Sequence, residues 1–131
     1  MIGDAPIEKF WVNELHQAFH PFEGRVKPVF MNDLSFGEIL KRVAALPPAS
    51  AIYFGDLVID AEGVPHRQEE VLSRLHAKAD APIFGQYDYQ LGGGIVGGPL
   101  LSVRALSRKT AEVAAQILAG CLLYTSPSPR D

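Results

Sequence analysis

The sequence has few of the features that mark disulfide-rich, nucleic-acid-binding or membrane-spanning proteins. Its 131 residues include one cysteine, Cys121, so no disulfide can form within the chain. Acidic residues outnumber basic ones by 15 to 12, and this balance provides no broad basic field for nucleic acid. No apolar run approaches the roughly 20 residues of a spanning helix. The first four residues also lack the basic start and apolar core of a secretory signal.

What the sequence does contain is an alternation of short apolar runs with amphipathic helices, which is typical of an α/β fold with a parallel sheet. The pattern predicts strands at residues 1–2, 26–31, 51–54 and 82–85. Pro28 cannot donate a hydrogen bond to a central ladder, so the second strand is placed at the sheet edge. We therefore predict a three-layer, Rossmann-like lobe with parallel strands in the order 2-1-3-4.

Four helices are predicted between and after these strands, at residues 7–19, 35–46, 68–79 and 102–118. The second has the clearest start, because Ser35 and Glu38 fit a capping box. These elements predict that residues 1–120 form one α/β unit. Residues 121–131 carry no useful periodicity and resemble a string, LYTSPSPRD, found at the ends of unrelated predicted proteins and similar to translated adaptor sequence. A native disordered terminus is the alternative, and neither interpretation gives this tail or Cys121 a function.

Candidate ligand-binding residues follow the predicted strands. In open α/β sheets, ligands bind beyond the carboxyl ends of the strands. Those ends carry carboxylates, an amide and phenols, namely Asp4, Asp56, Gln86, Tyr87, Asp88 and Tyr89. Aspartate is also a common turn residue, but two tyrosines flanking an acid exceed what a turn requires. We expect the tyrosines to pack against a small ligand and the three aspartates to orient its polar groups.

Other motifs have weaker support. Residues 92–97 match the spacing of a dinucleotide-binding fingerprint, but no strand directly precedes them and Pro99 follows before the helix, so a flexible crossing or close backbone packing is favoured. His16 and His20 could share a helix face, yet the sequence indicates no third metal ligand. No serine or cysteine stands in a nucleophilic arrangement. We therefore predict no catalytic residue, no metal and no cofactor.

A phosphoacceptor receiver is the alternative from another functional class. Asp4 and Asp56, after the first and third strands, could hold Mg²⁺ and accept phosphate. A receiver also needs a second acid beside the first, where Ala5 stands, and a lysine near its last strand, which is missing.

Three segments together carry a resemblance to a known family: 81–88 (APIFGQYD), 91–98 (LGGGIVGG) and 108–120 (RKTAEVAAQILAG). They look like the closing part of the ABC-transporter substrate-binding-protein family, which has type I periplasmic-binding folds. Versions fused to sensor histidine kinases look closest, because residues 22–26 and 42–48 also follow their pattern. The similarity extends over about residues 3–120.

The resemblance implies a non-catalytic, extracytoplasmic domain of two lobes that close on a small solute, such as an amino acid or an aromatic compound. This chain would supply most of the second lobe, and the first would lie upstream. A membrane helix and kinase would follow it in a sensor, whereas an ABC permease would be its partner in transport. Asp88 falls where the family places a polar residue facing the cleft. Tyr87 stands where many relatives have a small residue, so their ligands do not carry over.

Overall fold

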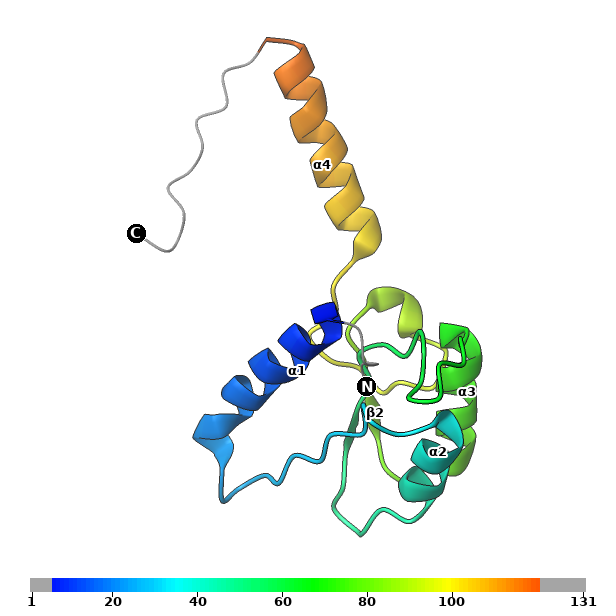
Figure 1. Ribbon diagram of the computed structural model, residues 1–131. Coiled ribbons are helices and arrows are strands. Elements are labelled where there is room, and N and C mark those ends of the chain that lie inside the picture. The colour runs from blue at the N-terminus through cyan, green and yellow to red at the C-terminus, as the bar shows by residue number, and fades with distance from the viewer. Residues whose placement is uncertain (1–5, 121–131) are drawn as a thin grey trace. The chain divides into compact units, whose positions relative to one another are not determined.

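The computed structural model describes residues 6–120 and divides the chain into two units, Met1–Leu100 and Leu101–Asp131 (Figure 1). The first unit contains helices α1 (Pro6–Phe19), α2 (Phe36–Ala44) and α3 (Gln68–Lys78), short 3-10 helices η1 (His20–Phe22) and η2 (Asp88–Gln90), and strands β1 (Ile52–Tyr53) and β2 (Ile83–Phe84). The second contains α4 (Val103–Leu118). All four helices agree with the predicted ranges to within two residues at either end.

The sheet of the first unit is small and parallel. Strands β1 and β2 pair in register, with Ile52 opposite Ile83 and Tyr53 opposite Phe84. This pairing confirms that the predicted third and fourth strands are parallel neighbours. Gly97 adds a further parallel bridge to Phe84, so the glycine-rich passage extends the sheet on the far side of β2. The sequence did not predict this extension.

One face of the sheet is covered by α2 and α3, which pack against each other (Figure 1). Their apolar stripes meet alternate strand residues in a single core, made of Phe36, Ile39, Leu40, Val43, Phe54, Leu57, Val71, Leu72, Leu75, Ile83 and Ile95. Removing these side chains from water is the main stabilising contribution to the unit.

The start of α2 is fixed by local and distant contacts together. The predicted capping box is present, with the Ser35 hydroxyl accepting from the Glu38 amide at 3.3 Å and the Glu38 carboxylate accepting from the Ser35 amide at 3.1 Å. The buried carboxylate of Asp60 accepts a hydrogen bond from the Phe36 amide at 3.1 Å. It also lies 3.0 Å from the His66 ring nitrogen Nε2. Asp60 thus ties the loop after β1 to the first residue of α2.

The prediction of a strand at residues 26–31 was wrong, because the structure has no strand there. Val26 and Val29 are 49% and 61% exposed, so this segment does not enter the core. Pro28 removes one donor from it. The only neighbour that the predicted order gave it, residues 1–2, lies outside the described residues. The sheet that the structure describes is therefore smaller than the four-stranded sheet expected.

Two helices contribute little to the core described here. In α1 the aromatic side chains of Phe10 and Trp11 are more than half exposed. In α4, all of whose residues are described, no residue is buried, although the Ser102 hydroxyl caps its start by accepting from the Ala105 amide. Between residues 6 and 120 no helix is long and apolar enough to cross a membrane.

Candidate functional site

Three tyrosines and a glutamine gather where β1 and β2 end. We call Tyr53, Gln86, Tyr87 and Tyr89 the tyrosine cluster. The Tyr53 hydroxyl donates to Gln86 Oε1 at 3.4 Å, and Gln86 Nε2 donates to the Tyr87 hydroxyl at 3.3 Å. The rings of Tyr87 and Tyr89 stack with centroids 5.3 Å apart and planes 11° from parallel. The cluster therefore presents a linked row of phenols at the carboxyl ends of two parallel strands, where an open α/β sheet binds its ligands.

A buried glutamine, Gln90, holds the backbone beneath this cluster. Its Oε1 accepts hydrogen bonds from the amides of Gln86 at 2.8 Å and Tyr87 at 2.9 Å. Its Nε2 donates to the carbonyl of Gly55, two residues after β1, at 3.3 Å. One side chain, only 3% exposed, thus joins the ends of both strands. Because Gln90 satisfies these backbone groups, it holds in place the loop that carries Tyr87 and Tyr89.

Glycine is required around Gln90 because the chain passes so close to it. A Cβ atom on Gly85 would lie 2.6 Å from Gln90 Oε1 and 2.6 Å from Ile95 Cδ1. On Gly94, which has φ +117°, a Cβ would lie 2.7 Å from the His76 side chain of α3. On Gly98, which has φ +144°, a Cβ would lie 2.6 Å from the carbonyl oxygen of Gly85, so the glycine-rich passage packs closely against the backbone. Gly97 pairs with Phe84 and opens no helix, which agrees with the rejection of a dinucleotide fingerprint.

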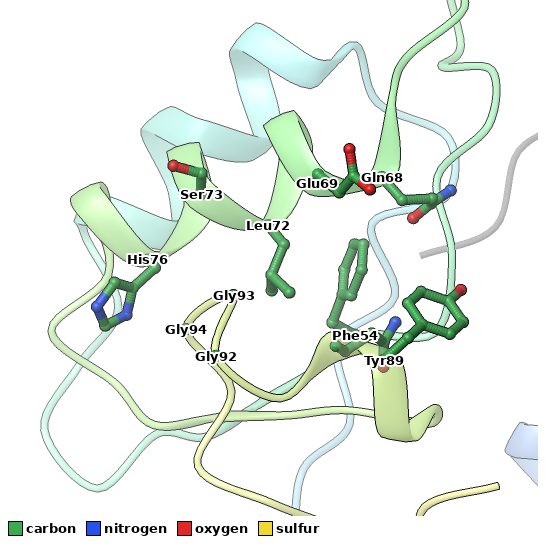
Figure 2. Close-up of a pocket in the computed structure, with 11 residues that line it drawn as sticks. Phe54, Gln68, Glu69, Leu72, Ser73, His76, Tyr89, Gly92, Gly93 and Gly94 are labelled. Atoms are coloured by element: carbon green, nitrogen blue, oxygen red, sulfur yellow. The ribbon is translucent and has the colours of Figure 1, made fainter. Parts of the chain in front are cut away.

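A cavity of about 410 Å³ adjoins the tyrosine cluster, between α3 and the glycine-rich loop (Figure 2). Phe54 and Leu72 provide apolar lining, and polar groups come from Gln68, Glu69, Ser73, His76, Tyr89 and Gln90. Tyr89 belongs to both the cluster and the lining, so the two form one candidate site. Figure 2 draws Gln68 and Tyr89 toward one end of the cavity and His76 toward the other.

Gln68 lines the cavity and also has a buried amide nitrogen. Its Oε1 accepts from the Leu57 amide at 3.5 Å. Its Nε2 atom is buried, and among the described residues it has no hydrogen-bond partner. Leaving a buried donor without an acceptor costs about 1 to 3 kcal/mol.

The electrostatic environment keeps the phenols neutral. Partial burial raises the pKa of Tyr89, and the neighbouring Asp56 and Tyr87 raise it further. Burial, followed by Tyr87, also raises the pKa of Tyr53. Both hydroxyls therefore stay protonated at neutral pH. Within the described part of the chain, neither the cluster nor the cavity lining includes a lysine or an arginine.

The structure brings together four of the six predicted site residues. Gln86, Tyr87 and Tyr89 are in direct or stacking contact, and Asp56 lies close enough to Tyr89 to influence its ionisation. Asp88 begins η2 and is half-buried. Asp4 lies outside the described residues.

Sequence reasoning missed Tyr53 and every lining residue of the cavity except Tyr89, among them Gln68, Glu69 and Gln90. Tyr53 stands inside a predicted strand, where an alternating pattern would have placed it on the face opposite Phe54. Gln68 and Glu69 were read only as the first residues of a helix. No local pattern marks Gln90.

Among residues 6–120 no group of three or more His, Cys, Asp or Glu side chains is placed to hold a metal ion. Comparisons with protein families, with curated proteins and with solved structures found no match for this chain. What the site can bind therefore has to be inferred from its own geometry and chemistry.

Proposed function

We propose that this chain binds a small solute, without catalysis, at the tyrosine cluster and the adjoining cavity. The observation that carries the proposal is the cavity of about 410 Å³ beside Tyr89. Its volume lies within the roughly 300 to 1,000 Å³ typical of small-molecule pockets. It also combines an apolar lining, Phe54 and Leu72, with a few polar groups, as such pockets do.

We further propose that the chain is one lobe of a two-lobed, type I periplasmic-binding domain. The parallel pairing of β1 with β2 and the position of the site at their carboxyl ends support this architecture. Tyr53 and Tyr89 are 42% and 57% exposed, as expected for side chains that meet a ligand and an opposing lobe. A ligand with higher affinity for the closed form would shift the population toward closure.

Whether such a domain serves sensing or transport depends on the protein that receives the signal or the solute. As the extracytoplasmic sensor of a histidine kinase, it would pass closure to a downstream membrane helix. As a transport component, it would deliver the solute to an ABC permease. Sequencing the native locus on both sides of this segment separates the two. A membrane helix and kinase domain downstream indicate the sensor, whereas adjacent permease genes indicate transport.

Titration of the full chain with amino acids and aromatic metabolites, followed by nuclear magnetic resonance, tests solute binding itself. A ligand should shift the backbone resonances of residues 86–94 in a saturable manner. Tyr89→Ala should weaken the binding at least about tenfold, since stacking and cavity contacts are both lost. Trp11→Ala, which removes an exposed aromatic ring from α1, is the matched control and should leave the affinity unchanged. Equal affinity in the Tyr89 variant and the parent would reject the site.

A further inference from the structure

One wall of the cavity is a row of exposed polar side chains on α3 (Figure 2). Glu69, Ser73 and His76 all line the cavity, and their spacing of four and three residues places them on one face of the helix. Glu69 stands in the first turn and His76 in the last, and the step between them is about 10 Å along the helix axis. A solute in the cavity can therefore reach polar groups over two turns of α3.

The facing wall is bare backbone, because it is formed by Gly92, Gly93 and Gly94. Gly92 and Gly94 have φ values of +86° and +117°, which favour glycine. A Cβ on Gly93 would lie 2.9 Å from the Leu72 side chain, and a Cβ on Gly94 would lie 2.7 Å from His76. The two walls thus come into contact at Leu72 and His76, and no side chain of the loop fills the space between them.

Tyr89 adds an aromatic surface to the same cavity. Its ring stacks on that of Tyr87 with centroids 5.3 Å apart, yet Tyr89 is 57% exposed, so the ring face turned away from Tyr87 is open to a ligand. Partial burial raises the pKa of Tyr89, and its hydroxyl therefore stays protonated at neutral pH. The side chain offers a flat apolar face together with a hydroxyl that can donate a hydrogen bond.

The hydrogen-bonding groups of the cavity match hydroxyls on the ligand. The Glu69 carboxylate only accepts, whereas the Ser73 and Tyr89 hydroxyls and a neutral imidazole at His76 both donate and accept. A ligand hydroxyl does both and therefore fits every one of them. An ammonium group would suit Glu69 but cannot accept from the other groups. A carboxylate or phosphate would face Glu69 with no lysine or arginine to balance it among the described lining residues.

From this combination we infer that the solute is a neutral sugar of one or two rings. The inference rests on the proposed solute-binding function and names its ligand class. Ring hydroxyls donate to Glu69 and exchange hydrogen bonds with His76 and Tyr89. The apolar C–H face of the sugar ring packs on the open face of Tyr89, which removes both surfaces from water. The absence of side chains on the glycine wall leaves room for a flat ring beside α3.

Six neutral sugars test the inference: D-ribose, D-xylose, D-glucose, D-galactose, maltose and cellobiose. Each is titrated into the full 131-residue chain, and the backbone resonances of residues 69–76 and 86–94 are followed by nuclear magnetic resonance. At least one sugar should shift both segments in a saturable manner, because it contacts both walls. The 2-amino and uronic acid counterparts of the tightest-binding monosaccharide should bind at least about threefold more weakly.

Variants on α3 assign the binding to named side chains. Glu69→Gln should weaken binding of the tightest sugar about 3- to 10-fold, because a charge-assisted hydrogen bond becomes a neutral one. Glu70→Gln makes the same change next to it, at a residue that pairs with Arg74 at 3.9 Å and does not line the cavity, and should leave the affinity unchanged.

His76 and Tyr89 separate hydrogen bonding from ring packing. His76→Phe keeps a ring beside Gly94 without its nitrogens and should also weaken binding about 3- to 10-fold, whereas His20→Phe, at an exposed position outside the cavity, is its control. Tyr89→Leu should weaken binding more than Tyr89→Phe, which removes only the hydroxyl. Unchanged circular dichroism at 222 nm shows that each variant is folded.

The outcomes distinguish the inference from the function on which it rests. If amino acids or aromatic metabolites shift residues 86–94 while no sugar does, the sugar inference is overturned and solute binding stands. Tighter binding of the amino sugar than of its neutral counterpart overturns the inference as well, and so does sugar binding that both Glu69→Gln and His76→Phe leave unchanged. If neither the sugars nor the metabolite panel shifts these resonances, the proposed function fails too.

Discussion

Replacing Gln90 by leucine should destabilise the chain more than any change to an exposed residue of the site. Leucine keeps most of the volume but provides neither a donor nor an acceptor. Three backbone groups lose their partner: the amides of Gln86 and Tyr87 and the carbonyl of Gly55. The residue is 3% exposed, so water cannot readily replace the amide.

The magnitude follows from the number of bonds. A buried group left without a partner costs about 1 to 3 kcal/mol. The 3.3 Å bond to the Gly55 carbonyl is the weakest of the three, and a small relaxation would admit water to one amide. We therefore expect a net loss of about 2 to 4 kcal/mol in the free energy of unfolding. For a unit of this size that corresponds to a fall in Tm of roughly 10 °C or more.

Thermal and urea unfolding monitored by circular dichroism at 222 nm measure this loss. Gln17→Leu makes the same chemical change at an exposed position of α1 and should stay within about 0.5 kcal/mol of the parent. Gln90→Glu is an informative intermediate, because it preserves the acceptor for the two amides and loses only the donor to Gly55. If Gln90→Leu unfolds at the same midpoint as Gln17→Leu, the joining role of Gln90 is wrong.

Other perturbations test the packing and the titrating groups. Gly85→Ala should lower the free energy of unfolding by about 1 to 3 kcal/mol, because the added Cβ overpacks against Gln90. Gly37→Ala in α2, where nothing lies within 4 Å of the added Cβ, should raise it by up to about 1 kcal/mol. The midpoints of urea unfolding measure both changes. The His66 contact, followed by the backbone amides, lowers the pKa of Asp60 in the folded chain, so its stabilising contribution is full above the unfolded pKa of about 3.9 and is lost as pH falls through the folded pKa. The parent should accordingly be more stable than Asp60→Asn at pH 6, with the difference shrinking toward pH 2, and a difference independent of pH would contradict this. Absorbance at 295 nm should show that the pKa of Tyr89 lies above the value of about 10 that is usual for tyrosine. Asp56→Asn removes the nearby negative charge and should lower that pKa.

Elements with local signals were predicted correctly from the sequence. The start of α2 was predictable because Ser35 and Glu38 satisfy each other's backbone amides within a single turn. The residues of β1 and β2 form apolar runs bounded by glycine and proline, and such runs mark buried strands. Residues 86–89 were predicted to bind a ligand because two tyrosines around an acid exceed the needs of a turn, and that role stays a prediction.

Features that depend on distant partners were not predictable in this way. The apolar pattern of residues 26–31 is compatible with a strand, but pairing needs a neighbour, and none is present among the described residues. Conversely, residues 96–97 look like a glycine-rich loop, yet Gly97 finds a partner in Phe84. Gln90 accepts locally from the amides of Gln86 and Tyr87, but its third partner, Gly55, lies 35 residues away, so the joining of the two strand ends depends on a tertiary contact.

In the candidate site, the buried side chain holds the backbone in place and the exposed side chains face solvent. Gln90 is buried and satisfies the backbone at both strand ends, so the loop that bears Tyr87 and Tyr89 is held before any ligand arrives. For the solute binding proposed above, ordering that loop would therefore cost little of the binding free energy, which is the advantage of a preorganised site. The tyrosines are not among the residues of the hydrophobic core. It follows that substitutions of Tyr89 should change affinity with little change in stability, whereas substitutions of Gln90 should change both.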